Sequence, residues 1–273
     1  MADKLDDIMR KLTRAGQHVR MAERIGNEFF GEPKLYTHRT ERQDHGSTTT
    51  LTVRVVSVQP TPPMFVVRIG EAAHQLRSAL DHVMWMLSWP VGKKQEQQVE
   101  FPIAYTRAEF VGRKGRKGID SLPGMRYRMP RVARGVRAVV ESLQPYNSRK
   151  CPGAESLGHL RAISNWDKHR TLLAIAGNIA AVEPEVSAYG DVRILSEQGF
   201  SGPLKPGAVM ARVEVQFGPG QSYVSVKPTA TLQPFFDDGM PEEIRGLNVG
   251  WVVTGACAFV EHTVIPKLKP FLI

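Results

Sequence analysis

The hydrophobic pattern of this chain changes its period near residue 177, and this change constrains the fold most. Before that point, apolar residues recur at three- and four-residue spacing over long segments, which predicts helices. After it, short segments are rich in β-branched residues or alternate, which predicts strands. The predicted helices cover 3–30, 63–89, 131–143 and 155–176, and the predicted strands cover 178–187, 191–196, 208–217 and 222–227.

Two further elements interrupt this division. A β-branched segment at 48–59 predicts a strand, and 242–268 predicts a C-terminal helix. Residues 218–221 (Gly-Pro-Gly-Gln) predict a hairpin turn. Because helices and strands are largely segregated along the chain, we expect an α+β fold. It would have a helical core of four to five helices, an antiparallel sheet of four to five strands, and a single compact domain over 1–273. Its parts would be a mainly helical 1–176, a β-rich 177–235 and the last helix.

Positive charge is concentrated in one segment. The chain carries a formal net charge of +9, and residues 113–137 hold nine Lys or Arg against one acid, Asp120. Such a segment is typical of a surface that contacts phosphates, although a solvated, flexible basic loop would have the same composition. The candidate nucleic-acid-binding residues are Arg113, Lys114, Arg116, Lys117, Arg126, Arg128 and Arg131.

Several classes of protein are disfavoured. The two cysteines, Cys151 and Cys257, form no CxxC pair, which indicates a reducing compartment. The N-terminus lacks the pattern of a signal peptide, and no uninterrupted apolar window of about 18 residues occurs, so we expect a cytoplasmic protein with no membrane partner. GxxxxGK[ST], GxSxG and HExxH are all missing from the sequence, so we expect no cofactor.

The predicted helix 63–89 carries the clearest candidate site. Opposite its apolar stripe lie His74, Arg77, Asp81 and His82. Trp85 follows Asp81 by one turn, and an aromatic residue there predicts that another helix or a second subunit covers this face. We therefore expect a homodimer through the helix that bears Trp85.

A second polar cluster lies on the predicted helix 155–176, where Lys168 and His169 project from the polar side. Asp167 falls toward the apolar stripe, where a carboxylate needs a cation, and Arg77 and Arg170 are the candidate partners. We infer that the two helices contact each other through their polar clusters.

Arg77 and His82 spell Arg-x4-His, which resembles the motif of the HEPN superfamily (higher eukaryotes and prokaryotes nucleotide-binding). The resemblance implies an α-helical domain, a composite site formed by two copies across a dimer, and metal-independent cleavage of RNA. Arg77 would then stabilise the charged phosphate in the transition state, and His82 would act as general base or acid. Asp81, His169 and Lys168 would be supporting catalytic groups.

Two other interpretations of the same residues stay open. His74, Asp81, His169 and Asp167 could form a metal site, although the seven-residue spacing of His74 and Asp81 is longer than that of helical zinc sites. Alternatively, both clusters could be buried salt-bridge networks that fix helix register in a non-catalytic interaction protein, since buried charges are normally paired.

Overall fold

The computed structural model describes residues 2–32, 34–88, 99–113, 122–169 and 175–272 of the 273-residue chain. They form two compact units, although the sequence had led us to expect one. The helical unit comprises residues 1–23, 64–173 and 238–273, and the strand unit comprises 24–63 and 174–237. Each unit is built from separate stretches of the chain. The α+β class with antiparallel sheets is confirmed.

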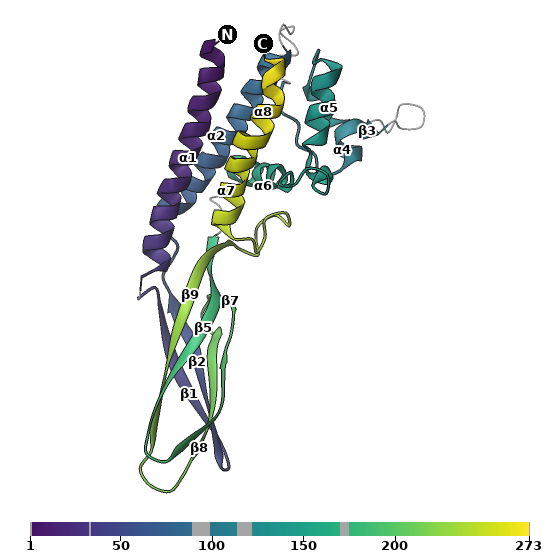
Figure 1. Ribbon diagram of the computed structural model, residues 1–273. Helices are drawn as coiled ribbons and strands as arrows, with labels where there is room; N and C mark the ends of the chain where they lie inside the picture. Colours follow the sequence, from purple (N-terminus) through teal and green to yellow (C-terminus); the bar gives the residue numbers. More distant parts are fainter. Residues whose placement is uncertain (1, 33, 89–98, 114–121, 170–174, 273) are drawn as a thin grey trace. The chain divides into compact units, whose positions relative to one another are not determined.

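Long helices form the framework of the helical unit. They are α1 (Ala2–Phe30, whose first part belongs here), α2 (Pro63–Ser88), α6 (Glu155–His169) and α7 (Val249–Phe259). Figure 1 shows α1, α2 and α7 side by side, and two contacts agree with it. Arg68 of α2 donates a hydrogen bond to His18 Nδ1 of α1 at 3.3 Å, and Thr254 of α7 donates one to Glu23 at 3.4 Å.

Shorter elements complete this unit. They are α4 (Arg107–Val111), the two-residue strands β3 (Gly112–Arg113) and β4 (Leu122–Pro123), the 3₁₀ turns η2 (Met125–Arg128) and η3 (Pro145–Asn147), and α5 (Arg134–Ser142). The predicted helix over 131–143 begins three residues late. Arg131 has a φ of 59°, which is incompatible with a right-handed helix.

The C-terminal helix differs from its prediction in start and regularity. It begins at Val249, because Asn248 caps it and accepts a hydrogen bond from the Trp251 N–H at 3.0 Å. A π-helical turn, η4 (Val260–Val264), joins α7 to α8 (Ile265–Leu268), and η5 (Lys269–Phe271) ends the segment. Pro266 has no N–H for the usual bond to residue 262, which accounts for the wider turn before it.

The core of the helical unit follows the apolar stripe predicted for α2. Leu76, Leu80, Val83 and Met84 are fully buried, while Leu87 is half-buried. Leu157 and Leu160 of α6 and Val260 and Val264 of η4 are also buried. At about 1.5 to 3 kcal/mol for each large apolar side chain, this burial holds α2 rigidly. The opposite, polar face of α2 is thereby fixed in position.

The strand unit contains two antiparallel sheets. One has the order β1 (Tyr36–His45), β2 (Thr48–Val58), β8 (Val209–Phe217) and β6 (Val192–Gly199). The other has the order β7 (Gly202–Pro203), β5 (Ile175–Tyr189) and β9 (Tyr223–Phe236). Val53 of β2 and Val213 and Val215 of β8 are fully buried and form part of the core of the strand unit.

Strand β1 was not expected from the sequence. It is polar and mostly exposed, and it lies at an edge, where only β2 holds it. The register runs from Tyr36 opposite Val58 to His45 opposite Thr48, and the turn places Gly46 at a φ of 64°. A polar edge strand lacks the alternation on which strand prediction depends.

Two other predictions were wrong. Residues 218–221 do not close a hairpin, because β8 pairs with β2 and β6 while β9 pairs with β5. The predicted helix 155–176 ends at His169, and Ile175 already pairs with Phe236 in the second sheet. Residues 170–174 lie outside the described part of the chain. From Ile175 onward the sequence fits either period, and pairing with β9 makes it a strand.

Candidate functional site on helix α2

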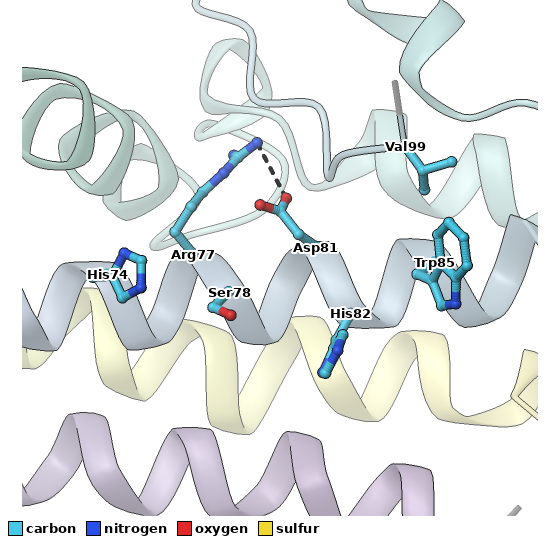
Figure 2. Close-up of a pocket in the computed structure, with 7 residues that line it drawn as sticks. All are labelled: His74, Arg77, Ser78, Asp81, His82, Trp85 and Val99. Atoms are coloured by element: carbon cyan, nitrogen blue, oxygen red, sulfur yellow. Dashed lines mark ion pairs between the residues drawn. The ribbon is translucent and has the colours of Figure 1, made fainter. Parts of the chain in front are cut away.

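The polar face of α2 lines a pocket with a cavity volume of about 340 Å³. Six of its lining residues come from α2, and the seventh is Val99 (Figure 2). At 100° per residue the six residues form two adjacent columns. The arginine column consists of Arg77, Asp81 and Trp85, and the histidine column consists of His74, Ser78 and His82.

Carboxylates surround the guanidinium of the arginine column. Arg77 Nη2 lies 3.2 Å from Asp81 Oδ1 and 3.4 Å from Glu100 Oε2, and the side chain is only 12% exposed. Burial lowers the pKa of Arg77, an effect that the Asp81 carboxylate opposes and Arg161 reinforces. Because both carboxylates contact the same nitrogen, the guanidinium is held in one orientation.

The acidic partners also tie α2 to other segments. Asp81 Oδ1 accepts a hydrogen bond from the Phe101 N–H at 2.9 Å. Glu100 forms an ion pair with Arg128, and its N–H donates to the Arg128 carbonyl at 3.2 Å. Burial lowers the pKa of Arg128, and the charges of Arg77 and Arg161 lower it further. The segment that contributes Val99 to the pocket is therefore fixed at the next two residues, Glu100 and Phe101.

A second arginine makes contacts that stabilise the fold. Arg161 of α6 donates to the Ile103 carbonyl at 2.9 Å and to Glu109 Oε1 at 2.6 Å. Its guanidinium also lies over the Tyr105 ring, 4.6 Å from the centroid. These contacts place Arg161 among structural interactions of α6 with the segment 101–109.

The histidine column has a different environment. His74 and His82 are exposed, and Ser78 between them is half-buried. Ser78 Oγ accepts a hydrogen bond from Lys11 Nζ of α1 at 2.7 Å. Figure 2 shows the His82 ring pointing away from Arg77, as the five-residue separation of about 140° around a helix requires. A ligand in the pocket would meet two imidazoles and the Ser78 hydroxyl on this side.

The five predicted catalytic residues have different outcomes. Arg77, Asp81 and His82 line the same pocket. Lys168 and His169 belong to the last turn of α6, and their side chains lie outside the described part of the structure. Their proximity to the pocket therefore stays a prediction.

Asp167 was assigned the wrong surroundings. It is exposed, and its carboxylate lies against Gly70 of α2, where an added Cβ would be 2.7 Å from Asp167 Oδ1. Gly70 precedes Arg77 by seven residues, or about 10 Å along the helix axis. The described partners of Arg77 are thus Asp81 and Glu100 and not Asp167.

Helix α6 does approach α2 at Gly70. Contact between the two polar clusters stays a prediction, because the side chains of Lys168 and His169 lie outside the described part of the structure. Arg170, the other candidate partner of Asp167, lies outside the described residues.

The predicted basic segment is described only in part. Arg128 is paired with Glu100, whereas Arg131 is exposed. Arg113 lies in β3 and Arg126 in η2, and the structure describes the backbone of both but not their side chains. Lys114, Arg116 and Lys117 lie outside the described residues. Through Arg128, the segment adjoins the residues that flank the pocket.

Sequence reasoning missed Lys11 and Glu100. Glu100 comes from an irregular segment, and Lys11 looks like any polar residue of an amphipathic helix. Lys11 is 67 residues from its partner Ser78. Long-range pairing of this kind leaves no local signal.

Metal ligation lacks support in the described residues, where no three His, Cys, Asp or Glu side chains lie close enough to share an ion. Of the set considered from the sequence, Asp81 is engaged by Arg77 and by the Phe101 N–H, and Asp167 lies against Gly70. The side chain of His169 is outside the described residues.

Across the described residues, one helical segment, Val249–Phe271, has the length and apolarity of a membrane span. Its inward face belongs to the core, since Val252, Val253, Ala256, Val260 and Val264 are buried. A core helix of a soluble protein has the same character, so this segment is weak evidence for a membrane.

No family model, no curated protein and no solved structure matches the chain. The resemblance to the HEPN superfamily therefore depends on Arg77 and His82 and on their surroundings. Function has to be argued from the chemistry of the pocket.

Proposed function

We propose that this protein binds RNA at the α2 pocket and cleaves it without a metal ion, as a HEPN-like ribonuclease. One observation carries the proposal: Arg77, Ser78, Asp81 and His82 line the same pocket, next to an aromatic ring from Trp85. The pocket thus combines a fixed cation, a hydroxyl and an exposed imidazole. Cleavage of a phosphodiester requires groups of this kind, which transfer protons and stabilise the charge that develops on the phosphate.

The reaction needs no group beyond RNA and protein. His82 takes the proton of a ribose 2′-hydroxyl, and the 2′-oxygen attacks the adjacent phosphorus. The bond from phosphorus to the 5′-oxygen breaks, and the imidazolium returns the proton to that oxygen. The products are a 2′,3′-cyclic phosphate and a 5′-hydroxyl. Histidine suits both steps because its ordinary pKa lies near neutral pH.

Arg77 stabilises the charge that develops on the phosphoryl oxygens. Asp81 and Glu100 both contact Nη2, and no described residue accepts a hydrogen bond from its remaining N–H groups. An oriented donor costs little to reorganise during the reaction, and the loss of one such donor lowers kcat by about 10²- to 10³-fold.

Neighbouring features support RNA as the ligand. The backbone of Glu100 binds that of Arg128, so the basic segment reaches the flank of the pocket. Trp85 is half-buried on the same face, where a second copy of α2 would cover it in a homodimer. The protein would act in the cytoplasm, since its two cysteines are free.

The test is cleavage of a short RNA in EDTA by the wild type, His82→Ala and His45→Ala. His45 is also exposed but belongs to the β1 hairpin in the strand unit. His82→Ala should lower the cleavage rate by about 10²- to 10⁴-fold with an unchanged unfolding midpoint, and His45→Ala should change neither. Full cleavage by His82→Ala would contradict the proposal.

A non-catalytic interaction protein is the second candidate. Its support is the closed set of contacts among Arg77, Asp81, Glu100 and Arg128, which joins α2 to two other segments. This function predicts that Arg77→Ala destabilises the fold while no RNA cleavage is found in the wild type. RNA affinity that falls steeply with salt, without cleavage, would indicate binding alone.

A further inference from the structure

We propose that Lys11 of α1 is the phosphate-binding residue of the α2 pocket and that Ser78 holds its ammonium group in place. This inference rests on the proposed function and names the residue that supplies the uncompensated positive charge. The ligand is an anionic phosphate of an RNA backbone.

The position of Lys11 is the first argument. Its Nζ donates to Ser78 Oγ at 2.7 Å, and Ser78 lies in the histidine column between His74 and His82. The lysine is half-buried, so the bond to Ser78 is partly shielded from water. A flexible side chain is therefore held beside a pocket that its own helix does not line.

Charge balance is the second argument. Arg77 has two carboxylate partners, whereas no carboxylate in the described part of the chain lies within 4 Å of the Lys11 ammonium. A half-buried charge is stable when an anion offsets it. An ammonium group has three donors, and Ser78 takes one of them, so two stay available for phosphate oxygens.

The donor geometry adds a third argument. Ser78 Oγ accepts from Lys11, and its own hydroxyl hydrogen is directed elsewhere, so it can donate to the same phosphate. The exposed imidazoles of His74 and His82 lie one turn away on either side. Lysine acts on phosphate as a point charge and reads no base, so it should favour RNA of any sequence equally.

The experiment measures binding of a short RNA whose riboses are 2′-O-methylated at every position, which prevents cleavage. Lys11→Met keeps the apolar stem and removes the charge. Lys150→Met makes the same charge change at an exposed site of the helical unit. Lys11→Met should weaken binding about fivefold for every sequence and lower the salt dependence of binding by about 0.7 to 1 in log–log slope.

Lys150→Met should bind as the wild type does, and Lys11→Arg should restore most of the affinity. Ser78→Ala should lower affinity less than Lys11→Met, because the ammonium remains but is no longer held. Equal affinity and equal salt slope for Lys11→Met and Lys150→Met, with both folded, would overturn the inference while cleavage by His82 could still stand. Conversely, loss of affinity only in Lys11→Met, in a protein that never cleaves RNA, would retain this site and overturn the cleavage proposal.

Discussion

The arginine column and the histidine column are neighbours on α2, yet the surroundings of their charged groups are opposite. In the arginine column, Arg77 is nearly buried and contacts two carboxylates that also fix the segment 99–101. In the histidine column, the imidazoles are exposed, and Lys11, which donates to Ser78, has a neutral hydroxyl and no carboxylate as its partner among the described residues.

This difference separates what holds the site from what meets the ligand. Ion pairs that are largely removed from water link segments, and the loss of one partner strongly destabilises the fold. Exposed or uncompensated groups contribute little to the fold and are available for binding. The arginine column should therefore control stability in addition to the charge stabilisation that Arg77 supplies in cleavage, whereas the histidine column should control RNA binding and proton transfer with little effect on stability.

The largest expected effect tests the arginine column. Arg77→Met should lower the free energy of unfolding by about 2 to 3 kcal/mol, because Asp81 and Glu100 lose a shared partner in a partly buried site. His82→Ala should change it by less than about 0.5 kcal/mol, since that side chain is exposed. Urea denaturation measures both. Equal losses of stability would remove the distinction between the columns.

A smaller effect comes from removing one acid of the arginine column. Asp81→Asn keeps an oxygen that accepts from the Phe101 N–H but removes the negative charge beside Arg77. We expect RNA affinity to rise about threefold at low salt, because a like charge no longer opposes phosphate. Asp167→Asn, which makes the same charge change at an exposed site, is the control. Weaker binding in Asp81→Asn would show that this carboxylate itself contacts the ligand.

The histidines outside the pocket give the third prediction, in the pH dependence of stability. Burial lowers the pKa of His18, as do Arg68 and Arg14, while Glu71 opposes the shift. Burial likewise lowers the pKa of His159, against Glu155 and Glu243. The unfolded chain thus binds protons that the native state does not, so stability should be full above about pH 6.5 and fall as the pH decreases toward the native pKa values.

His18→Gln and His159→Gln should each flatten this dependence, as thermal unfolding between pH 5 and 7 would show. A wild-type protein with constant stability over that range would contradict the assignment. Both variants should still bind RNA, since neither histidine lines the pocket. This result would separate the histidines that affect stability from those that affect RNA binding.

Much of the fold could be predicted from local pattern, and the site could be predicted only in part. The periodicity of 63–89 places its apolar stripe correctly, and so it also places Arg77, Asp81 and His82 on the opposite face. Strand β1 could not be predicted, because its residues are polar and only pairing with β2 makes it a strand. Lys11 and Glu100 reach the site through contacts distant in sequence, which no local pattern encodes.

The most direct test of the account is an NMR titration of protein with ¹⁵N-labelled histidine and the uncleavable RNA, in EDTA. We expect the imidazole signals of His74 and His82 to shift with increasing RNA, and those of buried His18 and His159 to stay in place. Signals of His74 and His82 that remain unchanged at saturating RNA would contradict the assignment of this pocket.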